Sequence, residues 1–311
     1  MRVIICLDYL KGPKMGAVAR DGTRMSEKFL WEQEAEAVRT DAMASRSAGE
    51  NFPVALRILP AARRRHLMAI YGFARITDDI GDEAPVAERA ALLDELEADL
   101  GRLKDGQARL PVIRALEPTI CGLGVPAQLF IDIIGANRQD QVVSRYETFG
   151  ELAGYCRLSA NPIGRMVLYV FGAYSDHRAE LSDRVCTALQ LAEHWQDVAE
   201  DYRAGRIYLP GADLRAHGVA ESDLAAPAAA PRLLELMKFE TRRAAELLDS
   251  GAPLVGTLRG TARLAVGGYV AGGRAALASI AAAGYDVLAR PAVPAKRTVA
   301  AQLVRSVVTG R

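Results

Sequence analysis

Paired cysteines, strand-like patterns and long apolar runs are all missing from this sequence, and each absence excludes a class of protein. The 311-residue chain has four cysteines, and no two of them have the spacing of a metal or redox motif. We therefore expect a reducing, cytoplasmic setting. Alternating runs of β-branched residues, which would indicate strands, do not occur either. The fold class that we predict is all-α.

Apolar runs long enough to span a bilayer are also missing. The most apolar stretch, 257–284, is interrupted by Arg259, Arg263 and Arg274. The opening segment MRVIICLDYL has too few apolar residues for a signal peptide. We expect a soluble protein, peripheral to the inner face of a membrane at most.

An excess of one charge sign is lacking as well. Lys and Arg together number 39 and Asp and Glu number 38. Without a strong positive field, the chain has no general attraction for nucleic acid. We expect no nucleic-acid partner, and a monomer is the default oligomeric state.

What the sequence does contain is a series of helical patterns. They begin near Asn51 and are separated by breaks such as GLGVP (122–126) and LPGAD (209–213). Half of the residues are hydrophobic, which is enough for a substantial core. We predict one helical domain over 47–311. Residues 1–46 lack a buried period, and we interpret them as a flexible N-terminal extension or the result of a misplaced start codon.

The stretch YGFARITDDIGDEA (71–84) combines a core-like helical pattern with aspartates. At 100° per residue along a helix over 62–83, Asp78 and Asp82 continue the apolar stripe that contains Tyr71. Carboxylates on a buried face must meet a cation or water, because burying unpaired charge is costly. The alternative is a frayed, solvated helix end.

A second acidic stripe lies in QLAEHWQDVAEDYRAGRIYLP (190–210). Asp197 and Asp201 are again four residues apart, and Glu193 lies one turn earlier on nearly the same line. A single polar stripe is usually a solvated face. Two such pairs on separate helices, each with arginines nearby, favour a shared function.

Diphosphate activation by metal ions uses this pattern. Mg²⁺ prefers carboxylate oxygens and leaves coordination positions for phosphate oxygens and water. Facing helices with carboxylates at i and i+4 would hold a diphosphate through such ions, and the nearby Arg75, Arg203 and Arg206 would neutralise remaining charge. We predict that Mg²⁺ assists departure of the diphosphate, which generates a carbocation.

A carbocation survives only in a dry, apolar pocket with aromatic faces nearby. Phe52, Tyr71, Tyr155 and Tyr269 are candidates for such faces, although plain packing is their commoner role. A four-helix di-iron protein would need Glu-x-x-His pairs, and none of the four histidines follows a glutamate at that spacing. A helical scaffold with acidic patches is the non-enzyme alternative.

The two acidic motifs resemble those of the squalene/phytoene synthase family, the head-to-head prenyl-diphosphate synthases. AIYGFARITDDIGD (69–82) is similar to the first aspartate-rich motif of the family and QDVAEDYRAGRIYLP (196–210) to the second. The resemblance extends from about Asn51 to Arg290. It implies an all-helical terpenoid-synthase fold, Mg²⁺ as cofactor and a central hydrophobic cavity.

The resemblance also implies roles for single residues. Positions that match metal or diphosphate ligands of the family are Arg75, Asp78, Asp82, Tyr155, Asp197, Asp201 and Arg206, with Tyr269 a further match in a later helix. The candidate catalytic residues are these four aspartates and Tyr155. Asn51 stands where many members carry a serine, and we place it with Phe52 and Tyr71 among the substrate-binding candidates. Glu193 replaces the usual asparagine, and it either binds the metal or orients a ligand.

Three segments, ENFPVA, SANPIGR and HWQDV, are similar to the hydroxysqualene synthase branch of bacterial hopanoid pathways. That likeness implies presqualene diphosphate as substrate, loss of its diphosphate, and capture of the rearranged cation by water. Squalene or presqualene diphosphate synthesis from farnesyl diphosphate and phytoene synthesis are the alternatives. No G-x-G-x-x-G motif follows a predicted strand, which leaves the use of NADPH undecided.

The basic tail AKRTVAAQLVRSVV (295–308) places Val299, Leu303 and Val307 near one face of a helix. Docking of this face on the domain is the simpler interpretation. Transient peripheral contact with a membrane, into which an isoprenoid product partitions, is the alternative.

Overall fold

The computed structural model describes residues 59–289 and 296–310. Every regular element within these ranges is a helix, and extended segments pair only at one isolated bridge, between Arg145 and Ile207. The predicted all-α fold is confirmed. The predicted N-terminal extension, 1–46, lies outside the described residues.

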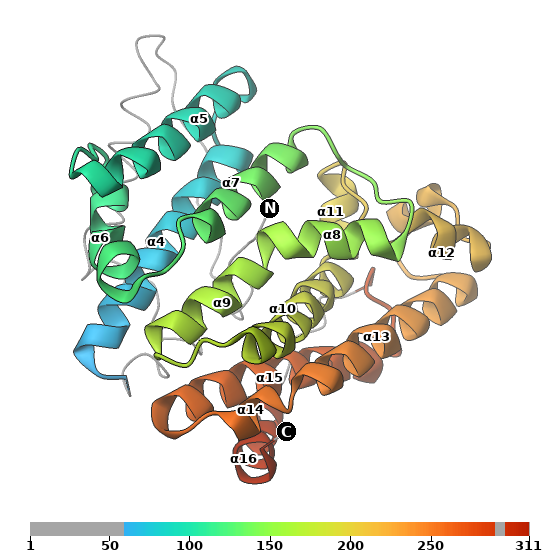
Figure 1. Ribbon diagram of the computed structural model, residues 1–311. Helices are drawn as coiled ribbons and strands as arrows, with labels where there is room; N and C mark the ends of the chain where they lie inside the picture. The colour runs from blue at the N-terminus through green and yellow to red at the C-terminus, as the bar shows by residue number, and fades with distance from the viewer. Residues whose placement is uncertain (1–58, 290–295, 311) are drawn as a thin grey trace. The chain divides into compact units, whose positions relative to one another are not determined.

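The chain divides into two compact units, one ending at Arg138 and the other beginning at Gln139. The elements of the first unit are α4 (Ala61–Asp82), α5 (Val86–Arg102), η2 (Leu103–Asp105), α6 (Pro111–Leu123) and most of α7 (Gln128–Asp140) (Figure 1). The elements of the second are α8 (Phe149–Ser159), α9 (Asn161–Val170), α10 (Asp176–Gln196), α11 (Val198–Arg203), α12 (Gly211–Ala216), η3 (Glu221–Ala225), α13 (Pro231–Gly251), α14 (Leu254–Thr257), α15 (Gly260–Ala282) and α16 (Lys296–Thr309).

In the first unit, α4 packs against α6 and α5. Phe73 of α4 is completely buried, and its ring packs edge-on against that of Phe130 in α7, with centroids 5.1 Å apart. Asp99, near the end of α5, is buried and accepts hydrogen bonds from the backbone N–H groups of Arg109 and Leu110, at 2.9 and 2.8 Å. These bonds hold the loop that leads into α6, because they pair backbone donors that have no partner within the helix.

In the second unit, α10 packs against α13, α9, α15 and α8 (Figure 1). Two glycines permit this close packing. A Cβ atom on Gly251, at the end of α13, would lie 2.7 Å from the carbonyl oxygen of Leu181 and 2.9 Å from the backbone nitrogen of Val185. A Cβ atom on Gly273 of α15 would lie 2.6 Å from a methyl carbon of Leu189. A larger residue at Gly251 would push α13 away from the backbone of α10, whereas one at Gly273 would force the Leu189 side chain to move.

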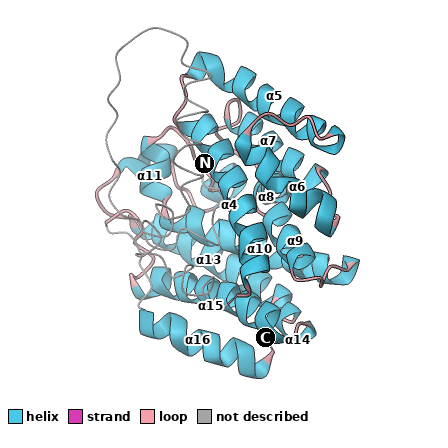
Figure 2. Cartoon of the chain, turned by 90° about the vertical axis from the view of Figure 1, so that its left-hand side faces the viewer, coloured by secondary structure: helices cyan, strands magenta, loops and turns pink. Residues whose placement is uncertain are grey.

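The C-terminal helix α16 packs along α15 and contacts α14 (Figure 2). Ser306 of α16 is buried, and its Oγ accepts a hydrogen bond from Arg274 of α15 at 3.1 Å. Arg263 of α15 donates a hydrogen bond to the carbonyl oxygen of Val307. The predicted docking of the basic tail is confirmed for α16.

One helix of the described residues, α15, is long and apolar enough to cross a membrane. Half of its most apolar window is nevertheless buried inside the protein. A core helix of a soluble protein has the same properties, so this single helix is weak support for a membrane span.

Candidate active site

The first acidic stripe lies at the end of α4. Asp78 and Asp79 are buried, with 5% and 6% of their surface exposed. Asn137 of α7 donates a hydrogen bond from Nδ2 to Asp78 Oδ1 at 3.2 Å, and Arg75 Nε lies 2.9 Å from Asp79 Oδ1. An amide and a guanidinium therefore orient two buried carboxylates within one unit.

The structure differs from the sequence prediction at two of these aspartates. Asp82 is exposed, because α4 ends at this residue and the buried stripe ends with it. Asp79, which lies off the predicted stripe, is buried because α4 is covered on more than one face. Thr77 and Ile80, on either side of the Asp78–Asp79 pair, are also buried.

The second acidic stripe lies where α10 gives way to α11. The helix is interrupted at Asp197, which has φ −100° and ψ 11°. The backbone bonds nevertheless continue across the break, from Asp197 N to Glu193 O at 2.9 Å and from Asp201 N to Asp197 O at 2.8 Å. The one-turn spacing of the three carboxylates is therefore kept, and all three side chains are half-buried.

A buried cluster of aromatic rings and one acid lies beside this junction. Tyr155 of α8 has no exposed surface, and its hydroxyl donates a hydrogen bond to Asp140 Oδ2 at 3.0 Å. The ring of Tyr146 lies 5.5 Å from that of Tyr155 and 5.9 Å from that of Tyr208. The ring of Tyr208 in turn stacks on the imidazole of His194, with centroids 3.7 Å apart and planes 13° from parallel.

Burial shifts the ionisation of this cluster. It raises the pKa of Asp140 to about 6, against the opposing effects of Arg206 and the Tyr155 hydrogen bond. It lowers the pKa of His194 to about 3, and the positive charge of Arg206 acts in the same direction. The pKa values of Tyr155 and Tyr208 lie well above the usual range, chiefly because both phenols are buried. At neutral pH the cluster therefore holds a neutral imidazole and neutral phenols beside one guanidinium.

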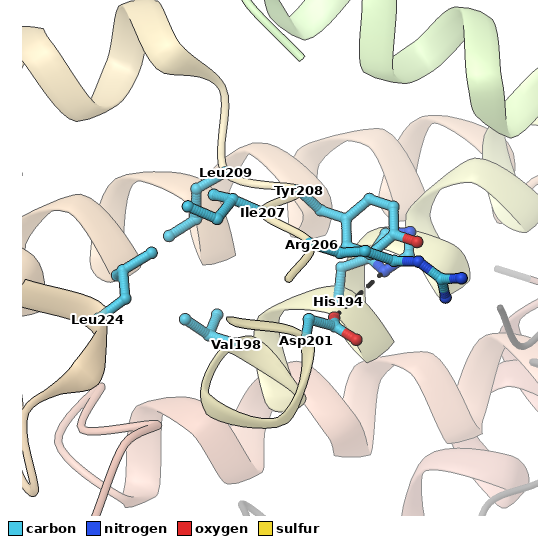
Figure 3. Close-up of a pocket in the computed structure, with 8 residues that line it drawn as sticks. All are labelled: His194, Val198, Asp201, Arg206, Ile207, Tyr208, Leu209 and Leu224. Carbon is cyan, nitrogen blue, oxygen red and sulfur yellow. Dashed lines mark ion pairs between the residues drawn. The ribbon is translucent and has the colours of Figure 1, made fainter. Parts of the chain in front are cut away.

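A small cavity lies next to the junction of α10 and α11 (Figure 3). Its volume of about 10 Å³ is close to the space that one water molecule needs. Figure 3 shows the apolar lining side chains on one side and the polar ones on the other. The apolar residues are Val198, Ile207, Leu209 and Leu224, and the polar ones are His194, Asp201, Arg206 and Tyr208.

The predicted site residues are distributed over both units. Tyr71, Arg75, Asp78 and Asp82 belong to the first unit, whereas Tyr155, Glu193, Asp197, Asp201, Arg206 and Tyr269 belong to the second. Asn51 and Phe52 lie outside the described residues. Within the second unit, the positive charge of Arg206 interacts with Tyr155 and Asp201, so the structure brings these three predicted residues together. Tyr71 and Tyr269 are half-buried.

Several polar residues of the site were not predicted from the sequence. They are Asn137, Asp140, Tyr146, His194 and Tyr208. His194 and Tyr208 stand within the second acidic motif, and their position beside its carboxylates is a signal visible in the sequence. Asn137 and Asp140 carry no such signal, because they contact Asp78 and Tyr155, respectively, only in the folded units.

The acidic residues have the donor chemistry that Mg²⁺ prefers. In the described part of the chain, no three His, Cys, Asp or Glu side chains are close enough together to hold an ion by themselves. Mg²⁺ sites for phosphate substrates commonly use one or two carboxylates and complete the coordination with water and phosphate oxygens. Pairs of carboxylates such as Asp197 and Asp201 fit that kind of site.

Comparison with known families matches residues 45–298 to the model for squalene/phytoene synthase. The chain is 35% identical over 224 residues to hydroxysqualene synthase of Sinorhizobium fredii, covering 71% of this chain and 74% of that protein. It is 37% identical over 213 residues to hydroxysqualene synthase of Rhodopseudomonas palustris, covering 68% and 72%. Phytoene synthase of Mycobacterium tuberculosis is 31% identical over 224 residues, covering 71% of this chain and 74% of that protein.

Solved structures show the same relationship. A crystal structure of squalene synthase from Alicyclobacillus acidocaldarius has a TM-score of 0.74 and 39% sequence identity, covering 83% of this chain and 96% of that chain. A dehydrosqualene synthase in complex with a ligand has a TM-score of 0.78 at 23% identity, covering 91% and 98%. The latter likeness establishes the fold alone. The fold is that of the terpenoid synthases.

Proposed function

Because this chain belongs to the squalene/phytoene synthase family, we propose that it is a Mg²⁺-dependent enzyme that ionises presqualene diphosphate and converts it to hydroxysqualene. The similarity to two hydroxysqualene synthases, at 35% and 37% identity, supports this choice of reaction. The observation that carries the chemistry is the pair of one-turn-spaced carboxylate motifs, one at the end of α4 and one at the α10–α11 junction.

The residues of the first unit orient acidic ligands. Asn137 holds Asp78 through its amide, so the carboxylate keeps one direction. Arg75 is paired with Asp79, and 46% of its side chain is exposed. In that position its guanidinium also meets an incoming phosphate oxygen.

The residues of the second unit combine acid ligands with an apolar aromatic wall. Asp197 and Asp201 are one turn apart and Arg206 adds positive charge beside them, so this side also suits a diphosphate. Tyr155 presents a ring held in place by the hydrogen bond of its hydroxyl to Asp140. Fixed aromatic faces stabilise a nearby carbocation, and buried phenols with raised pKa values stay protonated beside it. Bound Mg²⁺ would supply Lewis-acid stabilisation of the leaving diphosphate.

The reaction is tested by product analysis. The purified protein is incubated with presqualene, farnesyl or geranylgeranyl diphosphate, with Mg²⁺ or EDTA, and with or without NADPH. We expect hydroxysqualene from presqualene diphosphate without NADPH. In ¹⁸O-labelled water the product should gain one heavy oxygen, because water captures the cation. The assignment would be wrong if farnesyl diphosphate gave presqualene diphosphate or squalene, or if geranylgeranyl diphosphate gave phytoene. Each of these products identifies one of the alternative reactions.

Phytoene synthesis is the second candidate, because curated phytoene synthases match the chain at 31% identity over a similar share of its length. Geranylgeranyl diphosphate is longer than farnesyl diphosphate, so the substrate panel separates the two reactions. A phytoene product formed without any turnover of presqualene diphosphate would favour this candidate.

The roles of the carboxylates are tested by Asp78→Asn and Asp197→Asn. We expect each change to lower turnover by about 10²-fold or more, because it removes charge stabilisation that acts in the transition state. The melting temperature should stay close to that of the wild type. Asp105→Asn, an exposed aspartate after α5, is the matched control and should keep full activity. Normal turnover by Asp78→Asn, or wild-type activity in EDTA, would overturn the ionisation mechanism.

A further inference from the structure

The imidazole of His194 is fixed on two sides. Its ring stacks on Tyr208, with centroids 3.7 Å apart. Gln190, one turn earlier on α10, places its amide Nε2 3.1 Å from His194 Nε2. Only 6% of the histidine surface is exposed. A ring restrained in its plane and at one nitrogen has a defined direction for the other nitrogen, Nδ1.

That second nitrogen points at a carboxylate. His194 Nδ1 lies 3.9 Å from Asp201 Oδ2, and a dashed line marks this contact in Figure 3. A lone pair on Nδ1 would face the negative oxygen, which is repulsive. A proton on Nδ1 makes the contact attractive, and the unprotonated Nε2 then accepts from the amide of Gln190. The carboxylate of Asp201 therefore selects the Nδ1–H tautomer.

The distance of 3.9 Å is too long for a direct hydrogen bond. The small cavity that both residues line presents almost only apolar surface, so it supplies no polar partners for a bridging water. The link between His194 and Asp201 is therefore an electrostatic contact between the Nδ1–H group and the carboxylate, and apolar surroundings strengthen such a contact.

We propose that His194 is a positioning residue for Asp201, acting through the electrostatic contact between Nδ1–H and the carboxylate. Asp201 would thereby keep one orientation toward its ligand, as Asn137 does for Asp78 in the other unit. The inference rests on the proposed function in one respect only, namely that Asp201 serves the diphosphate–metal site. Partners of this kind typically change metal affinity about 10- to 100-fold when they are removed.

The tautomer is tested by ¹⁵N NMR of histidine-labelled protein, which does not depend on activity. The chain has four histidines, so the His194 signals are assigned by their loss in His194→Phe. We expect Nδ1 to have the chemical shift of a protonated nitrogen and Nε2 that of an unprotonated one. The chemical shift of Nδ1 should change in Asp201→Asn. A protonated Nε2, or His194 chemical shifts that are unchanged in Asp201→Asn, would overturn the proposal.

The positioning role is tested by comparing His194→Phe with His194→Asn. Phenylalanine keeps the ring stacked on Tyr208 but has no donor, whereas the asparagine amide keeps a donor near the place of Nδ1. We expect the Mg²⁺ concentration for half-maximal activity to rise at least 10-fold in His194→Phe and less than 3-fold in His194→Asn. Mg²⁺ with inorganic diphosphate should also raise the melting temperature less in His194→Phe than in His194→Asn.

These measurements separate failure of the inference from failure of the proposed function. The role of His194 would be overturned if His194→Phe bound Mg²⁺ and diphosphate like the wild type and its melting temperature responded to them to the same extent. Wild-type protein that shows no response to Mg²⁺ would refute the function, while the NMR result still decides the His194–Asp201 link.

Discussion

Replacing Glu240 with glutamine should remove a loss of stability that the protein undergoes as the pH rises from about 5 to about 8. Glu240 of α13 has no exposed surface and lies against Asp213 of α12. Arg243 donates hydrogen bonds to Asp213 Oδ2 at 2.8 Å and to Glu240 at 3.2 Å. Its guanidinium also lies over the rings of Phe149 and Phe239, at 4.4 and 4.5 Å. One cation thus serves two adjacent carboxyl groups.

The two carboxyl groups share the cation unequally. Burial raises the pKa of Glu240 to about 8, and the hydrogen bond and charge of Asp213 add to this effect despite the opposing charge of Arg243. For Asp213, burial opposes ionisation, but hydrogen bonds from Arg243 and Glu240 hold its pKa below the usual value. At pH 7 Glu240 is therefore protonated and donates to an ionised Asp213.

The sign of the pH dependence follows from the proton on Glu240. The folded protein keeps this proton up to about pH 8, whereas the unfolded chain releases it near 4.5. Raising the pH through this interval favours the unfolded state, so the free energy of unfolding falls and then levels off above pH 8. At about 1.4 kcal/mol per pH unit, the upper limit is about 5 kcal/mol. Local relaxation and water entry lower it, and we expect about 2–3 kcal/mol.

Urea unfolding followed by circular dichroism at pH 5 to 9 measures the effect. Glutamine has the shape of the protonated side chain and donates the same hydrogen bond to Asp213, so Glu240→Gln should lose most of the slope. It should be more stable than the wild type at pH 9 by about 2 kcal/mol. Asp140 titrates in the same direction in both proteins, so the difference between them isolates Glu240. An identical slope in the variant would refute the reasoning.

Three further changes have defined outcomes. Gly251→Ala should lower the free energy of unfolding by about 1–3 kcal/mol, because its Cβ would meet the backbone of α10; an unchanged urea midpoint would contradict this packing. Deleting residues 1–42 should leave turnover nearly intact, because the family match begins at residue 45, and a folded but inactive truncation would contradict it. Ending the chain at residue 295 should lower the melting temperature by several degrees, because α15 loses its partner helix. The truncated protein should float with anionic liposomes to the same extent as the full chain. If the full chain floats with the liposomes and the truncated protein does not, the tail contacts membranes, as the alternative interpretation holds.

The helical class and the two acidic motifs could be predicted because both depend on local spacing. Helical periodicity of apolar residues is visible in any window of the chain, and a side chain four residues from another lies on the same face. The same reasoning placed Asp78 on a buried face, as the structure shows. The spacing of Glu193, Asp197 and Asp201 survived even an interruption of the helix, because the backbone bonds continue across it.

Other features depend on residues that are distant in sequence, and no local pattern contains them. Asp79 is buried because several elements cover α4, and Asp82 is exposed because the helix ends there. The pairing of Asp140 with Tyr155 needs α7 and α8 to meet, and the stacking of His194 on Tyr208 needs the chain to turn back after α11. The sequence by itself determined which elements form and which faces carry charge. The tertiary structure alone decided which carboxyl groups are buried and what orients them, because burial and hydrogen bonding are set by neighbours that packing supplies.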